Sequence, residues 1–154
     1  MQHDGDIRIR CATREDLDAL MAIERRVFSA DSMSRKSVRH FLEASSASVV
    51  VAETRGEIVG CAIVLFHPSS PQSARLYSLA VVPAQEGRGI GPLLVRASEN
   101  AARARRRRQL RLEVHERNAR AIALYRKEGY AQFARRCGYY RDFGDALRFR
   151  KELH

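Results

Sequence analysis

The sequence contains no long apolar run. No stretch approaches the roughly 18 to 20 consecutive apolar residues that a membrane-spanning helix needs, so none is expected. The first residues, Met1–Asp6, lack the basic-then-apolar order of a secretory signal peptide. Both absences argue against membrane and secreted proteins, and they predict a soluble, cytoplasmic protein.

Cysteine is scarce as well. The chain has three cysteines, Cys11, Cys61 and Cys137, which lie far apart and match no metal-ligand spacing. This pattern predicts neither a disulfide framework nor a zinc site, and we expect no other metal site. All three cysteines are expected to be buried and to behave as small hydrophobic residues.

What the chain does contain fits a single domain over residues 1–154. Its 154 residues are 45% hydrophobic, which is enough for a sizeable core, while a second domain would not fit. Neither an internal repeat nor a change of composition marks a boundary between domains.

Positive charge is the strongest compositional feature, with a formal net charge of +10. Six arginines fall within the nine residues Arg103–Arg111. Such a run can attract nucleic acid or an acidic protein, but it is more often the solvated end of a helix, which is the interpretation we favour. In either case the charge favours anionic partners, among them a cofactor rich in phosphate.

The hydrophobic pattern predicts strands and helices in the order β-α-α-β-β-β-α-β-α-β-β. Thr13–Asp16 has the form of a capping box, and Ser34 can cap a second helix. We expect helices after these two caps, over 89–106 and over 118–128, and strands over 6–11, 48–53, 58–66, 74–82 and 109–115 with two more at the C-terminus.

The most informative stretch is Leu79–Leu94, which joins an apolar strand to a glycine-rich turn and an amphipathic helix. The first turn of a helix has backbone N–H groups without internal partners, and glycines let a phosphate approach them. Gly87, Gly89 and Gly91 therefore form a candidate anion site, beside which Arg88 adds a positive charge. Pro92 is tolerated in the first helical turn because its missing N–H costs little there.

Two other nucleotide-binding loops fit this stretch less well. A dinucleotide-binding fold needs an acid about 20 residues further on, and here that distance falls in the arginine run. A Walker-type phosphate loop needs Gly-Lys-Ser/Thr, which does not occur. A turn that merely needs positive φ angles remains the plain structural alternative.

Several short motifs occur together in a recognisable order. They are Leu79–Val81, Gly87–Gly91, Leu112–Val114, Asn118 with Ala121–Tyr125, Gly129–Tyr130, and Tyr139–Tyr140 followed by Asp145–Ala146. With them the chain resembles the GNAT superfamily of acetyltransferases over most of residues 6–152, and within it the ribosomal-protein-alanine N-acetyltransferase family. The resemblance implies an α/β (α+β) fold with a mixed sheet of six to seven strands, about four flanking helices, and a splayed pair of parallel strands at the cofactor site.

The resemblance implies acetyl-CoA as cosubstrate. In relatives the backbone at Leu79, Ala80 and Val81 pairs with the pantetheine amides as an added strand would, which is sensible for an edge of unpaired backbone groups. The turn through Gly87, Arg88, Gly89, Ile90, Gly91 and Pro92 would then hold the pyrophosphate. Asn118 would reach the cofactor, although a plain N-cap role explains it equally well.

Glu113 is the candidate general base. It alternates with Arg111 and His115 on one strand face, while Leu110, Leu112 and Val114 take the other. A carboxylate in a central strand is costly unless it is paired or functional. A salt bridge with Arg111 or another arginine is the structural alternative, and the resemblance favours proton removal from the attacking amine, directly or through water.

Tyr125 matches the tyrosine that relatives use to protonate the departing thiolate, and aromatic packing beside Ile122 and Leu124 is its structural alternative. The implied mechanism is direct attack of an amine on the thioester, without an acyl-enzyme. Tyr139 and Tyr140 resemble the aromatic pair that lines a peptide groove. Because strand neighbours point to opposite faces, we expect at most one of them to face that groove.

The acceptor is the least determined part. Glu86 departs from the usual Gln or Arg and should repel phosphate, and Ser29–Ser45, which commonly lines the acceptor side, matches the ribosomal enzyme poorly. We expect a primary amine, foremost a protein N-terminal α-amine. A small-molecule amine, a lysine side chain, and a non-catalytic CoA-binding or RNA-associated module are the alternatives, as a monomer or a homodimer.

Overall fold

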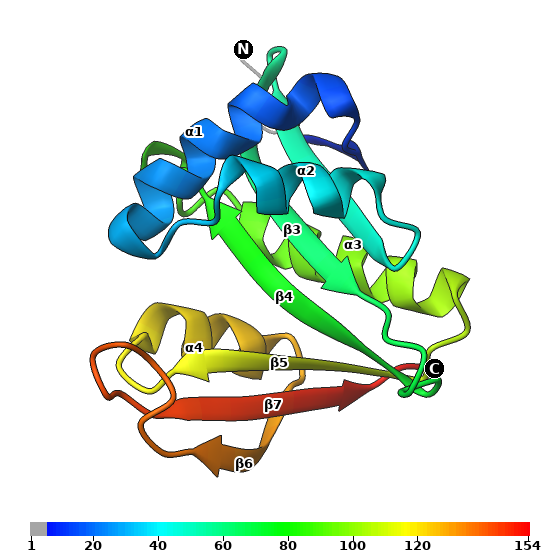
Figure 1. Ribbon diagram of the computed structural model, residues 1–154, viewed down its shortest axis with the longest axis vertical. Helices are drawn as coiled ribbons and strands as arrows, with labels where there is room; N and C mark the ends of the chain where they lie inside the picture. The colour runs from blue at the N-terminus through cyan, green and yellow to red at the C-terminus, as the bar shows by residue number, and fades with distance from the viewer. Residues whose placement is uncertain (1–5) are drawn as a thin grey trace.

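A computed structural model describes residues 6–154 and shows one seven-stranded sheet in the order β1-β2-β3-β4-β5-β7-β6, with helices on both faces (Figure 1). The prediction about a signal sequence falls on Met1–Asp6 and so lies almost wholly outside the described residues. The strands are β1 (Arg8–Cys11), β2 (Ala47–Thr54), β3 (Glu57–Leu65), β4 (Ser73–Val81), β5 (Gln109–His115), β6 (Ala131–Arg136) and β7 (Ala146–Glu152). The α-helices are α1 (Leu17–Phe28), α2 (Arg35–Glu43), α3 (Ile90–Ala104) and α4 (Ala119–Lys127).

The predicted order of elements is confirmed, and local caps explain where the first helices begin. The backbone N–H of Thr13 donates to Oδ2 of Asp16 at 2.7 Å, which completes the expected capping box before α1. The N–H of Ser37 donates to Oγ of Ser34 at 3.1 Å, so Ser34 is the N-cap of α2.

Two apolar clusters pack on opposite faces of the sheet. One joins α3 and α4 to the central strands, and includes Leu94, Leu112 and Phe149. The other joins α1 and α2 to β2, β3 and β4 only. Figure 1 shows these two helices in front of the first half of the sheet, so that no described helix covers the same face of β5, β7 and β6.

The two central strands, β4 and β5, separate along their length, as the splayed pair in the predicted fold requires. β4 and β5 are parallel and pair only at Ser73–Arg75 with Gln109–Arg111. Beyond Arg75 the strands diverge, which Figure 1 shows as the widening space between them. β4 stays paired with β3 up to Val81, so only its β5-facing side loses its partner.

The cysteine prediction is right for one residue and wrong for two. Cys61 is buried in the sheet, but Cys11 and Cys137 are exposed. Cys11 ends the edge strand β1, and Cys137 begins the loop after β6, so neither has a neighbouring layer to cover it. All three thiols are free.

No helix within residues 6–154 is long and apolar enough to cross a membrane. Nor do these residues contain a group of three or more His, Cys, Asp or Glu side chains that could hold a metal ion.

The arginine run Arg103–Arg111 is more than a solvated helix end. Helix α3 stops near its start, and the following residues turn back toward the sheet. The guanidiniums of Arg105 and Arg107 lie over the ring of Phe66 at 4.2 and 5.5 Å, and Arg107 donates to the carbonyl of Pro71 at 3.4 Å. Part of the charge therefore stabilises the base of the sheet.

Candidate active site

The glycine-rich turn leaves room on its outer side. Gly87 and Gly89 have φ angles of +85° and +80°, and Gly89 is the N-cap of α3. A Cβ built on either glycine would meet no described atom within 4 Å. The first N–H groups of α3 lack intrahelical acceptors, so the turn combines donors with open space, which suits a pyrophosphate.

Gly91 also has a packing role, and its contact with a phosphate stays a prediction. It lies inside the helix, and a Cβ there would come within 3.3 Å of the Leu124 side chain in α4. Its missing side chain lets α3 and α4 approach each other. Gly87 and Gly89 supply the positive φ angles of the turn, while Pro92 occupies the first helical turn as expected.

The unexpected acid of this turn has a partner. Glu86 forms an ion pair with Arg120 in the first turn of α4, and Arg88 donates to the side-chain oxygen of Gln85. The negative charge of Glu86 is therefore compensated within the protein. This arrangement removes the physical objection to phosphate binding at the turn.

The edge of β4 and the start of α4 complete this side of the site. From Leu76 to Val81 the β5-facing backbone of β4 has no strand partner, and this stretch includes Leu79 and Ala80. Asn118 accepts a hydrogen bond from the N–H of Ala121 at 3.1 Å, so it serves as the N-cap of α4. Contact of Asn118 with a cofactor stays a prediction.

Glu113 lies in β5 between two arginines. Its Oε1 is 2.5 Å from a terminal nitrogen of Arg75 in β4, and its Oε2 accepts from Nε of Arg148 in β7 at 3.3 Å. The side chain is only 11% exposed. Glu113 therefore does form salt bridges with arginines, which is the structural alternative to a catalytic role. Arg111 takes no part in them and donates instead to Gln109.

Neither arginine partner could be chosen from the sequence. Arg148 is the direct cross-strand neighbour of Glu113, a pairing that depends on the register of β5 with β7. Arg75 reaches Glu113 across the point where β4 and β5 begin to separate. A strand pattern alone fixes which face a side chain takes but not its neighbour on the next strand.

Tyr125 is buried in the core between α4 and the sheet. Its ring meets that of Tyr130 edge-on, with centroids 5.9 Å apart. Burial raises the pKa of its phenol well above the ordinary value, and the neighbouring Tyr140 adds to this effect. Tyr125 therefore keeps its proton at neutral and moderately alkaline pH.

Tyr139 and Tyr140 lie in the loop between β6 and β7, not on a strand as expected. Strand alternation consequently does not apply, yet the two rings still differ: Tyr139 is exposed and Tyr140 is half-buried. Burial and the negative charge of Glu113 raise the pKa of Tyr140 to about 12. The Tyr140 ring contacts the rings of His115 and Tyr139.

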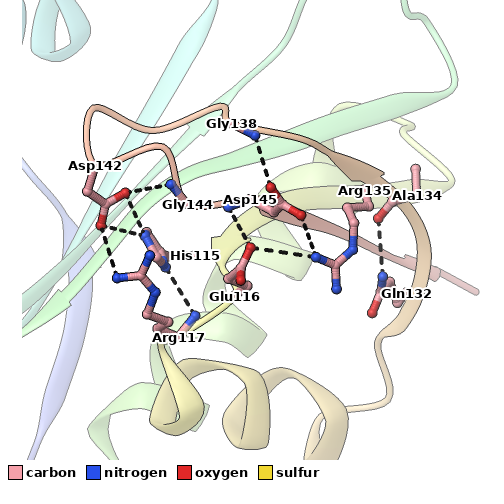
Figure 2. A network of polar contacts seen from close by, with 10 residues as sticks. All are labelled: His115, Glu116, Arg117, Gln132, Ala134, Arg135, Gly138, Asp142, Gly144 and Asp145. Carbon is pink, nitrogen blue, oxygen red and sulfur yellow. Dashed lines mark hydrogen bonds and ion pairs between the residues drawn. The ribbon is translucent and has the colours of Figure 1, made fainter.

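Two acids hold this loop in place, and no motif in the sequence indicates a role for the first, Asp142. Asp142 contacts Nε2 of His115 at 2.9 Å and accepts from the N–H of Gly144 at 2.8 Å (Figure 2). The ring of His115 stacks on Tyr140 with centroids 4.8 Å apart. Asp142 therefore fixes the histidine that supports Tyr140.

Asp145 holds the other end of the same loop. Its Oδ1 accepts from the N–H of Gly138 at 2.9 Å, and its Oδ2 pairs with Arg135 (Figure 2). Its own N–H donates to Glu116, the residue after β5, at 2.6 Å. The loop is thereby tied to the end of β5, where Glu113 and His115 lie.

Known proteins share this architecture. A sequence model of the Acetyltransferase (GNAT) family matches residues 15–130. The chain belongs to this family. The N-alpha-acetyltransferase RimI of Mycobacterium tuberculosis is 31% identical over 149 residues, which cover 95% of this chain and 92% of that protein. The N-alpha-acetyltransferase of Sulfurisphaera tokodaii is 30% identical over 151 residues, covering 92% and 90%.

A solved structure agrees with the GNAT assignment. The crystal structure of the ribosomal-protein-S18-alanine N-acetyltransferase from Escherichia coli superposes with a TM-score of 0.85 at 26% identity, covering 96% of this chain and 94% of that one. The family and the fold inferred from the motifs are confirmed. The chain is a GNAT acetyltransferase, an enzyme that transfers acyl groups.

Proposed function

We propose that this GNAT enzyme transfers the acetyl group of acetyl-CoA to the N-terminal α-amine of a protein or peptide. The observation that carries the proposal is the strand edge that β4 leaves unpaired from Leu76 to Val81, which leads into the open glycine-rich turn and lies beside β5, the strand of the largely buried Glu113. The N-alpha-acetyltransferases that it resembles over more than nine-tenths of its length support this acceptor.

The residues of the cofactor side fit CoA. The N–H groups of Ile90 and Gly91 and the side chain of Arg88 would hold the pyrophosphate, and the backbone of Leu79–Val81 would bind the pantetheine amides. Bound there, acetyl-CoA supplies an acetyl thioester that a neutral amine can attack. Backbone N–H groups of the β4 edge are the protein donors available to the thioester carbonyl.

Glu113 accepts the proton that the attacking amine loses. Both of its carboxylate oxygens are engaged by arginines, so the proton reaches it through a water molecule or after one arginine moves aside. Tyr125 keeps its phenolic proton because burial raises its pKa, and it can pass this proton to the departing sulfur. Tyr140, in the loop between β6 and β7 and stacked on His115, would line the acceptor side.

The choice of an α-amine has a physical basis. An α-amine has a pKa of about 8, so an appreciable fraction is already neutral at pH 7 to 8, whereas a lysine amine has a pKa of about 10.4. A single carboxylate held between two guanidiniums suits the acceptor that needs the least deprotonation.

An acetyl-transfer screen tests the proposal. It compares peptides with free and varied N-termini, the same peptides with a blocked N-terminus and an internal lysine, and small primary amines. We expect kcat/KM to be at least about tenfold higher for free N-termini. Equal rates on the blocked lysine peptides, or transfer to small amines alone, would contradict the proposal.

A further inference from the structure

The uncovered face of β5, β7 and β6 carries a compact group of cations next to Glu113. Because Leu110, Leu112 and Val114 face the core, Arg111 and Glu113 face the other side of β5. On β7 the core residues Leu147 and Phe149 likewise leave Arg148 and Arg150 on the uncovered side. In the sheet register, Glu113 is opposite Arg148 and Arg111 is opposite Arg150.

An aromatic ring holds these cations together. The guanidiniums of Arg111, Arg148 and Arg150 lie 5.2, 4.9 and 4.7 Å from the centre of the Phe133 ring in β6. We call Arg111, Phe133, Arg148 and Arg150 the arginine face. Stacking on one ring brings three positive charges close together, which costs electrostatic energy unless an anion offsets it.

The protein itself offsets only part of this charge. Glu113 pairs with Arg148, but within residues 6–154 no carboxylate lies within 4 Å of the guanidinium of Arg111 or of Arg150. Arg111 donates a hydrogen bond to the neutral side chain of Gln109. The side-chain amide of Gln109 in turn donates to Glu152 at 2.6 Å. Two cations of the arginine face thus remain available to an external anion.

An acceptor chain that runs from Glu113 toward the start of β5 would pass over the arginine face. Arg111 lies two residues before Glu113 on the same face of β5, a separation of about 6.6 Å at the usual strand rise. An extended peptide spans the same distance in two residues. A chain whose α-amine is at Glu113 and which runs along β5 therefore brings its third and following residues over Arg111 and Arg150.

We propose that the arginine face selects acceptor polypeptides that carry carboxylates at their third to fifth residues. This inference rests on the proposed function, because it requires a polypeptide acceptor. Single-stranded nucleic acid fits less well. Proteins that bind it stack its bases on the faces of aromatic side chains. Here guanidiniums already surround the ring of Phe133. Charge and continuity with Glu113 favour an acidic peptide.

The test uses three peptides with identical first two residues and with Glu, Gln or Lys at residues three to five. We expect kcat/KM to be about tenfold higher for the Glu peptide than for the Gln peptide, through KM, with the Lys peptide lowest. The preference should shrink as salt is raised. In the double variant Arg111→Gln/Arg150→Gln the Glu peptide should fall to the level of the Gln peptide, whose own kcat stays unchanged.

A matched control removes the same charge elsewhere. The double variant Arg106→Gln/Arg108→Gln alters the exposed turn between α3 and β5 and should keep the preference. Thermal melting of both variants checks that the fold is intact. Equal kcat/KM for the Glu and Gln peptides would overturn the inference while leaving N-terminal transfer standing, whereas no transfer to any of the peptides would overturn the proposed function. Competition by RNA that disappears in Arg111→Gln/Arg150→Gln would also overturn the inference, because the face would then serve nucleic acid.

Discussion

The proposed cofactor side and the proposed acceptor side of this enzyme are built in different ways. The glycine-rich turn and the strand edge before it come from one continuous stretch, Leu79–Leu94. The setting of Glu113 instead depends on Arg75 and Arg148, which are 73 residues apart in the sequence, and on a loop between β6 and β7. Local backbone rules govern the first side, and strand register governs the second.

This difference predicts that the proposed cofactor side tolerates fewer changes of sequence than the proposed acceptor side. A turn that needs glycine at positive φ and free helical N–H groups tolerates little change. An uncovered sheet face tolerates new side chains because no second layer packs on it. The three predictions that follow test whether the two sides can be disturbed separately.

The largest effect is expected on the cofactor side, from Gly89→Asp. The residue has a φ of +80°, which is strained for a side chain, and aspartate adds a negative charge at the glycine-rich turn. We expect acetyl-CoA affinity to fall at least about a hundredfold, as measured by calorimetry.

Gly56→Asp is the matched control for that variant. Gly56 lies in the turn between β2 and β3 with a φ of +79°, and a Cβ there also meets no atom within 4 Å. Gly56→Asp therefore imposes the same backbone strain and the same charge away from the glycine-rich turn before α3. It should leave acetyl-CoA affinity unchanged. If Gly89→Asp binds acetyl-CoA as the wild type does, the phosphate assignment is wrong.

The next effect concerns the acceptor side, through Glu113→Gln. The amide keeps the size of the side chain but cannot accept the proton, so we expect kcat to fall about a hundredfold. The loss should be larger at low pH, where more of the amine is protonated and needs a base. The measurement is the ratio of variant to wild-type kcat across pH, and a ratio that does not change with pH would argue against the role as base.

Glu53→Gln supplies the comparison for Glu113. Glu53 is also a strand carboxylate between two arginines, with Arg10 at 3.3 Å and Arg8 at 3.8 Å, and its side chain is 17% exposed. It lies on β2, away from the site. Loss of its ion pairs should affect stability and leave the pH profile of transfer unchanged.

The same contrast explains how far the sequence could predict this enzyme. Hydrophobic periodicity and helix caps predict the order of elements. A cap such as Ser34 or Gly89 depends only on residues close to it in the sequence. The partners of Glu113 were missed because they depend on which residues of β7 and β4 lie opposite β5. The pattern around Tyr140 predicts a strand, because it does not reveal that Asp142 and Asp145 hold a loop there.

The smallest effect is expected where the two sides meet, at Tyr125. In Tyr125→Phe we expect kcat to fall about tenfold, because a thiolate leaves more readily than an alkoxide and depends less on an acid. The raised pKa of Tyr125 has a definite sign: its acid form persists as pH rises past its ordinary value of about 10. The wild-type rate should therefore show no loss attributable to Tyr125 below pH 10.

Tyr130→Phe separates that proton from simple packing. The Tyr130 hydroxyl donates to the buried Glu99 at 2.8 Å, so its loss leaves a buried carboxylate with one partner fewer and should lower the melting temperature. The rate of transfer should change little. Tyr125→Phe should do the reverse, because residues 6–154 offer its hydroxyl no hydrogen-bond partner to lose. Full activity in Tyr125→Phe would contradict its role as the acid and would mean that solvent protonates the departing thiolate.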